Sequence, residues 1–222
     1  MNIQEYTNRD ALIAGVAEDL LADLKAELTK RESVSFVVPG GTTPGPIFDI
    51  LSKADIDWSR VHVMLSDERW VPDDHDRSNA KLLRERLLVA NARAAKFTPF
   101  FVADVDVTTA CADVSKALAG DLPVAVSMLG MGADMHTASL FPQAIGLEAA
   151  LSADAQMLCP IQAEGQEQRV TLSAPVLNGA SAKHIVIFGD DKRSALNVAQ
   201  SATPQEAPVA AVLNETKVHW AP

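Results

Sequence analysis

One histidine of the chain stands in a setting that suits proton transfer. His136 lies in the stretch LGMGADMHTASLFP, residues 129–142, where Gly130 and Gly132 interrupt an apolar run just before it. An imidazole titrates near neutral pH and can therefore take a proton from water or from a substrate. The alternative is a histidine that makes only structural hydrogen bonds. A preceding apolar strand and a predicted helix start at Thr137–Ser139 favour the catalytic interpretation.

The spacing of histidines and cysteines predicts no metal site. None of the five histidines forms an HxH, HExxH or HxxxH pattern. Cys111 and Cys159 lie far apart with no CxxC pair, so two buried, reduced thiols are favoured over a disulfide. A GxSxG elbow is also absent, which leaves a serine-hydrolase triad without an anchor. Water activated by a histidine is the simpler route to hydrolysis, and we expect neither a metal nor an organic cofactor.

The stretch PGGTTPG, residues 39–45, has the composition of a loop that binds an anion. Its glycines permit close backbone approach, and its hydroxyls donate hydrogen bonds. A helix predicted to begin near Pro46 favours negative charge at its N-terminus. The loop lacks the GKS or GKT ending of a nucleotide P-loop and is not GxGxxG. A plain turn therefore stays open as the alternative.

Charged residues also follow the next apolar run along the chain. The stretch SDERWVP, residues 66–72, places Asp67, Glu68 and Arg69 at the end of a predicted strand. One interpretation is a solvated charge cluster, since charged side chains at strand ends are usually exposed. In the functional interpretation an acid orients a sugar hydroxyl or a histidine, while Arg69 binds an anion or pairs with the acids.

Two further cations could meet at one ligand. Arg169 lies in QRVTLS and Lys192 lies in GDDKRS, and each alone is most simply a surface charge. If both belong to loops at strand ends, they converge on one phosphate, the arginine as a planar fork and the lysine as a point charge. Lys192 lies near a predicted helix start, where a positive charge interacts unfavourably with the helix dipole. A lysine at that position is therefore more easily explained by a function.

Apolar runs that alternate with amphipathic stretches predict the elements carrying these loops. Ser78 is suited to cap one of the helices. The predicted helices are Asp10–Glu32, SNAKLLRERLLV, VTTACADVSKALAG and DDKRSALNVAQS. The predicted strands are SVSFVV, VHVMLS, FTPFF, PVAVSMLG, QRVTLS, KHIVIFG and PVAAVL. Apolar strands that alternate with helices predict a mostly parallel sheet covered by helices on both faces.

We therefore predict a Rossmann-like α/β fold. No linker rich in Pro, Gly or Ser divides the chain, so a single domain over residues 1–222 is expected. Ligands bind such sheets where loops leave the carboxyl ends of the strands. The loops expected to meet there are 39–46, 66–72, 130–142, 169–173 and 189–193.

The charge of the chain narrows the class of partner. A net charge of −10 argues against nucleic acid and against an anionic membrane, because both require a basic face. A small anion needs a locally positive pocket in such a chain. No segment is apolar over the roughly 18 residues of a membrane span, and the acidic N-terminus lacks a signal-peptide core. We expect a cytoplasmic protein, a monomer or weak homo-oligomer.

The motifs together resemble those of a known family. VVPGGTTP, VHVMLSDERWVP followed by SNAKLLRERLL, LGMGADMHTASLFP, RVTLS and IVIFGDDKRSAL occur in the order and spacing of 6-phosphogluconolactonases. That family lies within the wider group that includes the glucosamine-6-phosphate isomerase/deaminases. The resemblance extends from about residue 33 to residue 200. It implies an isomerase/lactonase type of fold and a phosphorylated sugar lactone as the substrate.

The resemblance also implies a reaction and a role for each matched residue. The reaction is hydrolysis of 6-phospho-D-glucono-1,5-lactone to 6-phospho-D-gluconate in the oxidative pentose phosphate pathway. His136 matches the position of the family's catalytic base. Asp67 matches its second catalytic residue, which together with Arg69 resembles the family's pair of residues in the substrate pocket. The other implied substrate-binding residues are a sugar-phosphate loop and two phosphate-binding cations: Gly40, Gly41, Thr42, Thr43, Arg169 and Lys192.

Two positions bear on the alternatives to this function. The family usually has glycine where this chain has Met135, so a positive φ there would strain the turn before the histidine. The deaminase/isomerases have a glutamate five residues after the histidine, where this chain has Phe141. An apolar ring cannot transfer a proton, which disfavours an isomerase. A sugar-phosphate-binding regulator without catalysis is the other alternative, and Met135 is the only feature that supports it.

Overall fold

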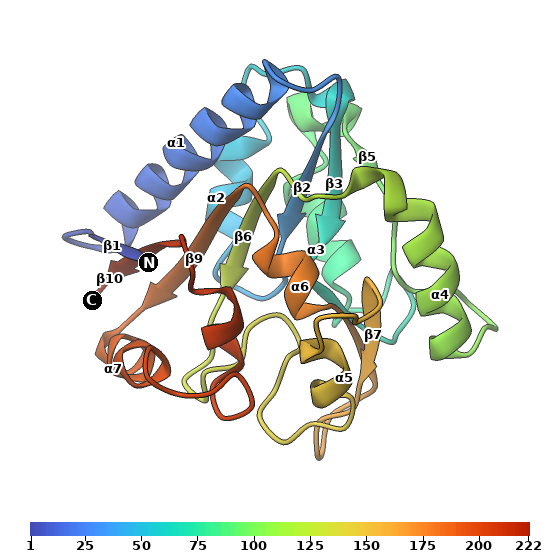
Figure 1. The fold of residues 1–222 in the computed structure, drawn as a ribbon. Helices are drawn as coiled ribbons and strands as arrows, with labels where there is room; N and C mark the ends of the chain where they lie inside the picture. The colour runs from blue at the N-terminus through green and yellow to red at the C-terminus, as the bar shows by residue number, and fades with distance from the viewer.

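A seven-stranded parallel sheet runs through the centre of the computed structural model, which describes residues 1–222 (Figure 1). The strand order is β1-β10-β9-β6-β2-β3-β5, and every neighbouring pair is parallel. The strands are β1 (Asn2–Glu5), β2 (Val34–Val38), β3 (Val61–Leu65), β5 (Lys96–Phe97), β6 (Val126–Gly130), β9 (Ala182–Phe188) and β10 (Lys217–Ala221). The predicted parallel sheet is confirmed.

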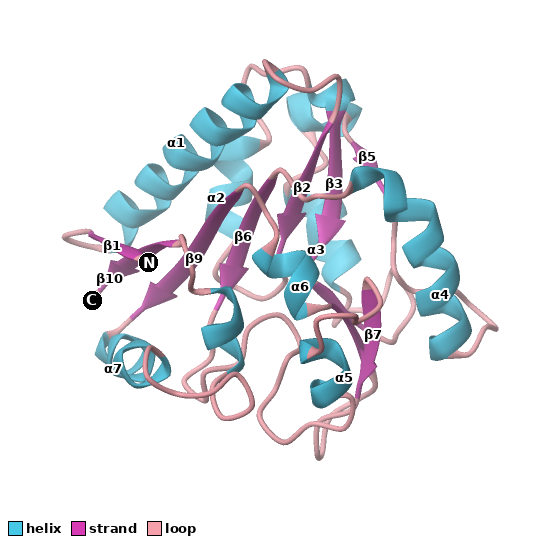
Figure 2. Cartoon of the chain, viewed as in Figure 1, coloured by secondary structure: helices cyan, strands magenta, loops and turns pink.

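Helices cover both faces of this sheet (Figure 2). The helices of the chain are α1 (Arg9–Leu28), α2 (Gly45–Leu51), α3 (Asn79–Arg86), α4 (Val107–Leu118), α5 (Leu147–Leu151), α6 (Ala174–Asn178) and α7 (Asp190–Ala199). In Figure 1, α2 and α3 lie behind the sheet and α6 lies in front of it. Ser78 caps α3, since its side chain accepts a hydrogen bond from the backbone N–H of Lys81. None of the helices is long and apolar enough to cross a membrane.

A second, smaller sheet corrects the expectation for residues 169–173. The strands β4 (Asp67–Arg69), β8 (Arg169–Leu172) and β7 (Leu158–Ile161) form an antiparallel sheet in the order β4-β8-β7. Arg169 therefore opens a strand of this second sheet and does not follow a strand of the parallel sheet. All of β8 is buried, and a short buried apolar run does not reveal which sheet it joins.

Two other sequence-based expectations were wrong. PVAAVL is the 3₁₀ helix η4 (Pro208–Val212) and not a strand, because proline has a fixed φ and no N–H to donate to a ladder. The last strand is β10, which starts nine residues after the start of η4. FTPFF contributes only Phe97 to the two-residue strand β5, and Pro99, two residues later, cannot donate to the ladder.

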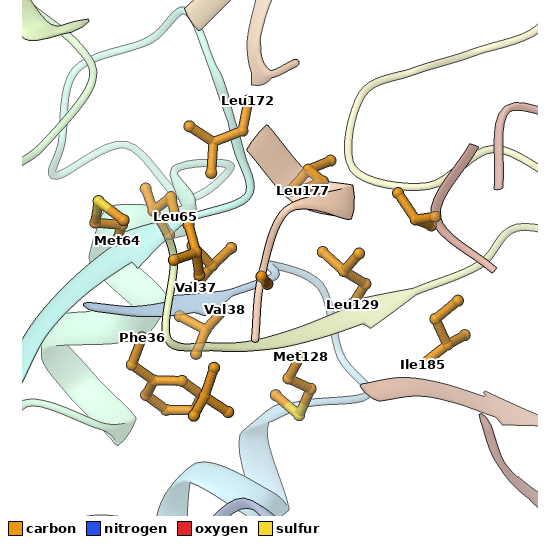
Figure 3. Packing of buried hydrophobic residues seen from close by; sticks show 14 of the residues in the cluster. Phe36, Val37, Val38, Met64, Leu65, Met128, Leu129, Leu172, Leu177 and Ile185 are labelled. Carbon is orange, nitrogen blue, oxygen red and sulfur yellow. The ribbon is translucent and has the colours of Figure 1, made fainter. Parts of the chain in front are cut away.

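The core is one cluster of 56 buried apolar residues. Figure 3 shows how side chains from β2, β3, β6 and β9 gather there with Leu172 of β8 and Leu177 of α6. The second sheet is thus packed on the first. Cys111 and Cys159 are free and buried, as predicted, and burial raises the pKa of their thiols to about 12 and about 11. Both thiols therefore stay protonated at neutral pH.

A chain of four polar side chains crosses the buried junction of α1, β9 and β10. The Tyr6 hydroxyl lies 2.9 Å from Nδ1 of His219, whose Nε2 lies 2.9 Å from Nδ1 of His184. Nε2 of His184 lies 2.8 Å from the Asp23 carboxylate. That carboxylate accepts, so if both imidazoles are neutral, the tyrosine and the two rings all donate in the same direction. Each ring nitrogen of the two histidines then has one hydrogen-bond partner.

The histidine chain predicts a fall in stability at mildly acidic pH. Burial and the neighbouring His184 lower the pKa of His219 from 6.5 to about 3, while Asp19 opposes the shift. The unfolded chain therefore binds a proton that the folded chain does not, and the free energy of unfolding decreases as pH falls below 6.5. Between pH 7 and pH 5, urea titrations should show a decrease up to about 2 kcal/mol larger in the wild type than in His219→Gln. Equal decreases in the two proteins would contradict this origin.

Candidate active site

A cleft of about 220 Å³ opens where the chain leaves the carboxyl ends of β2, β3, β6 and β9. This is the edge at which parallel sheets bind ligands. All nine residues singled out from the sequence line it: Gly40, Gly41, Thr42, Thr43, Asp67, Arg69, His136, Arg169 and Lys192. The structure therefore brings the whole predicted set together.

Asp134 fixes the imidazole of His136. Nδ1 of His136 lies 2.5 Å from Oδ1 of Asp134, and the backbone N–H of His136 donates to the same oxygen. The hydrogen bond from His136 lowers the pKa of Asp134, so the carboxylate is charged and must accept. In the neutral imidazole, Nδ1 then carries the proton and Nε2 has the free electron pair of a base. Asp134 was not a candidate from the sequence, although an acid two residues before a loop histidine was a usable signal.

The turn that carries His136 has a left-handed backbone. Met135 has φ 65° and Ala138 has φ 49°, so the predicted helix start at Thr137–Ser139 is wrong. A left-handed residue cannot continue a right-handed helix. Gly132 lies so close that a Cβ there would be 2.2 Å from Nδ1 of His136. The turn is held by the N–H of Gly132, which donates to the His136 carbonyl at 3.0 Å.

The left-handed conformation of Met135 predicts a difference between two isomeric substitutions. Met135→Leu and Met135→Ile place the same atoms in the turn, but a β-branched side chain tolerates positive φ much less well. The free energy of unfolding of the isoleucine variant should be about 1 kcal/mol lower than that of the leucine variant. Chemical denaturation of the two proteins measures this difference. Equal stabilities would mean that the turn relaxes to negative φ.

Asp67 is a buried carboxylate held by two serines. Its Oδ1 accepts from the hydroxyl of Ser66 at 2.7 Å, and its Oδ2 accepts from the hydroxyl of Ser139 at 2.6 Å. Nη1 of Arg169 lies 3.9 Å from Oδ2, which makes a long ion pair. Both side chains of this pair are at least nine-tenths buried. Asp67 therefore balances the charge of Arg169 in the wall of the cleft. The contact of Ser139 with Asp67 was not predicted from the sequence.

Two arginines of the cleft lie opposite each other on neighbouring strands of the small sheet. Arg69 and Arg169 are paired residues of β4 and β8. Arg169 donates from Nη2 to Gln166 at 2.8 Å, and Arg69 donates from Nη1 to the Arg77 carbonyl at 2.5 Å. The Nε of each arginine is buried without a partner. Burial lowers the pKa of Arg169, partly offset by Asp67. Neighbouring cations with unused donors favour an anion in the cleft.

Glu68 and Asn79 tie the second sheet to the anion loop. Glu68 is fully buried and accepts from the backbone N–H groups of Arg69, Asn79 and Ala80 and from the Ser78 hydroxyl. Burial raises the pKa of Glu68, and these four hydrogen bonds oppose the shift. Since Asp67 and Glu68 are buried, the interpretation of this segment as a solvated charge cluster is wrong.

Asn79 is a further cleft residue that the sequence did not reveal. Its Nδ2 donates to the Asp67 carbonyl at 2.8 Å. Its Oδ1 lies against Gly40, where a Cβ would be only 1.8 Å away. Gly41 has φ 90°, a conformation that glycine adopts without strain. Gly40 is therefore favoured by its close contact with Asn79, and Gly41 by its left-handed backbone.

The anion loop and Lys192 complete the cleft. Thr42 is exposed and Thr43 is half-buried, and the loop leads into α2 as predicted. Lys192 lies in the first turn of α7, which confirms its predicted place near a helix start. Lys192 is half-buried, and its ammonium makes no hydrogen bond or ion pair within the chain, in contrast to Arg69 and Arg169. These residues leave donors and positive charge free on one side of the cleft.

Comparisons with known proteins agree with this architecture. The family model for glucosamine-6-phosphate isomerases/6-phosphogluconolactonase matches residues 7–220. A 6-phosphogluconolactonase of Rhizobium meliloti is 36% identical over 229 residues, covering 100% of this chain and 99% of that protein. One of Pseudomonas aeruginosa is 36% identical and covers 94% and 90% of the two chains. The crystal structure of a 6-phosphogluconolactonase from Shewanella baltica superposes with a TM-score of 0.95 at 31% identity, covering 100% and 98%.

The parallel sheet and the cleft at its carboxyl edge define an α/β protein of the isomerase/lactonase type. The chain belongs to the glucosamine-6-phosphate isomerase/6-phosphogluconolactonase family. The resemblance drawn from the sequence motifs is thereby confirmed. Within the family, the relatives cited above all carry the name of the lactonase.

Proposed function

We propose that the cleft hydrolyses 6-phospho-D-glucono-1,5-lactone to 6-phospho-D-gluconate, with His136 activating the attacking water. The reaction follows from the family and from the lactonase relatives, and it belongs to the oxidative pentose phosphate pathway. The chain is a hydrolase that acts on a lactone. The observation that carries the residue assignment is the Asp134–His136 hydrogen bond, which leaves Nε2 as a base in a cleft whose arginines have unused donors.

The proposed chemistry is addition of water to C1 followed by ring opening. Nε2 of His136 takes a proton from water as the oxygen attacks C1, and the carbonyl electrons move to the exocyclic oxygen. The resulting oxyanion collapses, the bond between C1 and the ring oxygen breaks, and the imidazolium returns its proton to that ring oxygen. The product carboxylic acid then ionises. Asp134 stabilises the imidazolium during this cycle because its carboxylate accepts from Nδ1.

Arg169, Lys192 and the loop of residues 40–43 are proposed to bind the phosphate of the substrate. Unused arginine and lysine donors supply local positive charge in a chain whose net charge is −10. Binding at the phosphate holds C1 near His136, so remote binding energy favours the reaction. Asp67 is proposed to orient a sugar hydroxyl while it balances the charge of Arg169, and Arg69 is proposed to complete the pocket.

Phe141 argues against isomerisation in this cleft. It occupies the position at which the deaminase/isomerases carry a glutamate, and it is 7% exposed. Its ring packs on His136 with a centroid separation of 4.3 Å. A phenyl ring has no proton to transfer and leaves His136 without a second acid beside it. The alternative of a regulator without catalysis was based on Met135. In the structure Met135 has a left-handed backbone in the turn before His136, and the hydrogen bond between Asp134 and His136 is still made.

Several wider properties stay predictions. We propose that residues 1–222 form a single domain that acts in the cytoplasm. The nine proposed site residues come from one chain, which fits a monomer or weak homo-oligomer. Neither nucleic acid nor a membrane is expected as a partner, given the acidic charge. The proposed chemistry requires no metal or organic cofactor, since the base and the cations are side chains.

The role of His136 is tested by hydrolysis of freshly generated 6-phosphogluconolactone, measured above its spontaneous rate. Wild-type protein should turn the lactone over rapidly, and His136→Ala should lower kcat by about 100-fold or more. Calorimetric titration with 6-phosphogluconate should give Kd values within a few-fold for the two proteins. Turnover that survives in the variant would refute the base. An inactive wild type that still binds 6-phosphogluconate would point to a regulator.

The phosphate contacts are tested by removing the phosphate from the substrate. Glucono-1,5-lactone should show both a higher KM and a lower kcat than the phosphorylated lactone, because remote binding energy no longer positions C1. Lys192→Ala should weaken binding of the phosphorylated lactone and leave the constants for the unphosphorylated one unchanged. Equal losses on the two substrates would place Lys192 away from the phosphate.

A further inference from the structure

The ring of Phe141 contacts both of the proposed reactive parts of the cleft. Its centroid lies 4.3 Å from that of the His136 imidazole, with an angle of 34° between the planes. The guanidinium carbon of Arg169 lies 5.1 Å from the same centroid. The two rings are therefore in close contact, and the cation lies within the range at which an aromatic ring attracts it. One apolar side chain thus joins the proposed base to a proposed phosphate cation.

His136 needs a second constraint besides Asp134. Its side chain is 31% exposed, and its ring has a single hydrogen bond, at Nδ1. One hydrogen bond fixes the position of one atom but leaves the plane of the imidazole free to tilt. The packed ring of Phe141 restricts that tilt, because its centroid lies only 4.3 Å from that of the imidazole, with 34° between the two planes. The direction in which Nε2 points into the cleft therefore depends on Phe141.

Arg169 is held only loosely by its polar partners. Its Nη1 lies 3.5 Å from the Ser139 hydroxyl and 3.9 Å from Asp67, and its one close hydrogen bond is to Gln166. The Phe141 ring gives the guanidinium plane a further contact. Phe141 is itself firmly placed, since it is 7% exposed and its backbone N–H donates to the Ser139 carbonyl at 3.1 Å.

We propose that Phe141 is a positioning residue for hydrolysis, which holds the His136 imidazole and the Arg169 guanidinium in a fixed relation. The inference rests on the proposed roles of these two residues. A change at Phe141 alters the distance between the bound phosphate and the base, and it therefore affects kcat and KM together. A residue that only filled the core would change stability and leave both constants unaltered.

The test compares four variants under one lactonase assay. Phe141→Leu removes the ring, Phe141→Met replaces it with a flexible unbranched side chain in case the leucine variant does not fold, and Phe141→Tyr keeps the ring. Phe100→Leu is the matched control, because Phe100 is a core phenylalanine, 1% exposed, whose ring packs on neither His136 nor Arg169. Melting temperatures, kcat and KM are measured for each protein alongside His136→Ala.

The inference predicts that Phe141→Leu and Phe141→Met lower kcat by about tenfold or more and raise KM several-fold. Phe141→Tyr should stay within about threefold of wild type, and Phe100→Leu should lose stability with unchanged kcat and KM. Unchanged constants in both ring-deleted variants would overturn the inference alone. Full turnover by His136→Ala would instead overturn the proposed base, and with it the reason for holding its ring.

Discussion

The hydrogen bond between Asp134 and His136 is the interaction on which the proposed chemistry depends. A neutral imidazole is a useful base only if its free electron pair faces the reacting water, and the carboxylate at Nδ1 decides which nitrogen that is. The turn that brings the two side chains together is costly. Met135 has a left-handed backbone, and Gly132 lacks the Cβ that would collide with the imidazole.

The rest of the cleft is a scaffold that keeps charge where the ligand needs it. Asp67 and Glu68 are adjacent and both buried, but they have different tasks. Glu68 accepts four hydrogen bonds and fixes the start of α3, whereas Asp67 lies beside Arg169 in the cleft wall. Asn79 then joins this scaffold to the anion loop through its contact with Gly40. Arg69 and Lys192 have no ion-pair partner, and the Nε donors of Arg69 and Arg169 are unused, so the cleft carries charge opposite in sign to that of the chain as a whole.

Sequence periodicity predicted the parts of the fold that depend on burial. Apolar runs such as VHVMLS and KHIVIFG are strands of the parallel sheet, and their loops meet as expected. The errors occurred where local backbone chemistry or sheet pairing decides. Pro208 turned an apolar run into a 3₁₀ helix, positive φ at Ala138 stopped a helix, and β8 joined a second sheet. None of these outcomes is encoded in the spacing of apolar residues.

The candidate site divides in the same way. Residues whose chemistry is visible in a motif, such as His136, Arg169 and Lys192, were found from the sequence. Ser139 and Asn79 were not, because their roles come from contacts with residues distant in the chain. The sequence showed only that Phe141 stands where the deaminase/isomerases have a glutamate. Its contacts with two site residues became visible once the turn after His136 was placed.

The role of the hydrogen bond between Asp134 and His136 is tested most directly by the activity and the imidazole tautomer of Asp134→Asn. An asparagine amide can donate to Nδ1, which moves the ring proton to Nε2 and removes the base from the cleft. We expect a loss of about 100-fold or more in kcat, a Kd for 6-phosphogluconate within a few-fold of wild type, and the Nε2–H tautomer by ¹⁵N NMR. Wild-type kcat in a variant that shows the Nε2–H tautomer would contradict the proposed role of the hydrogen bond.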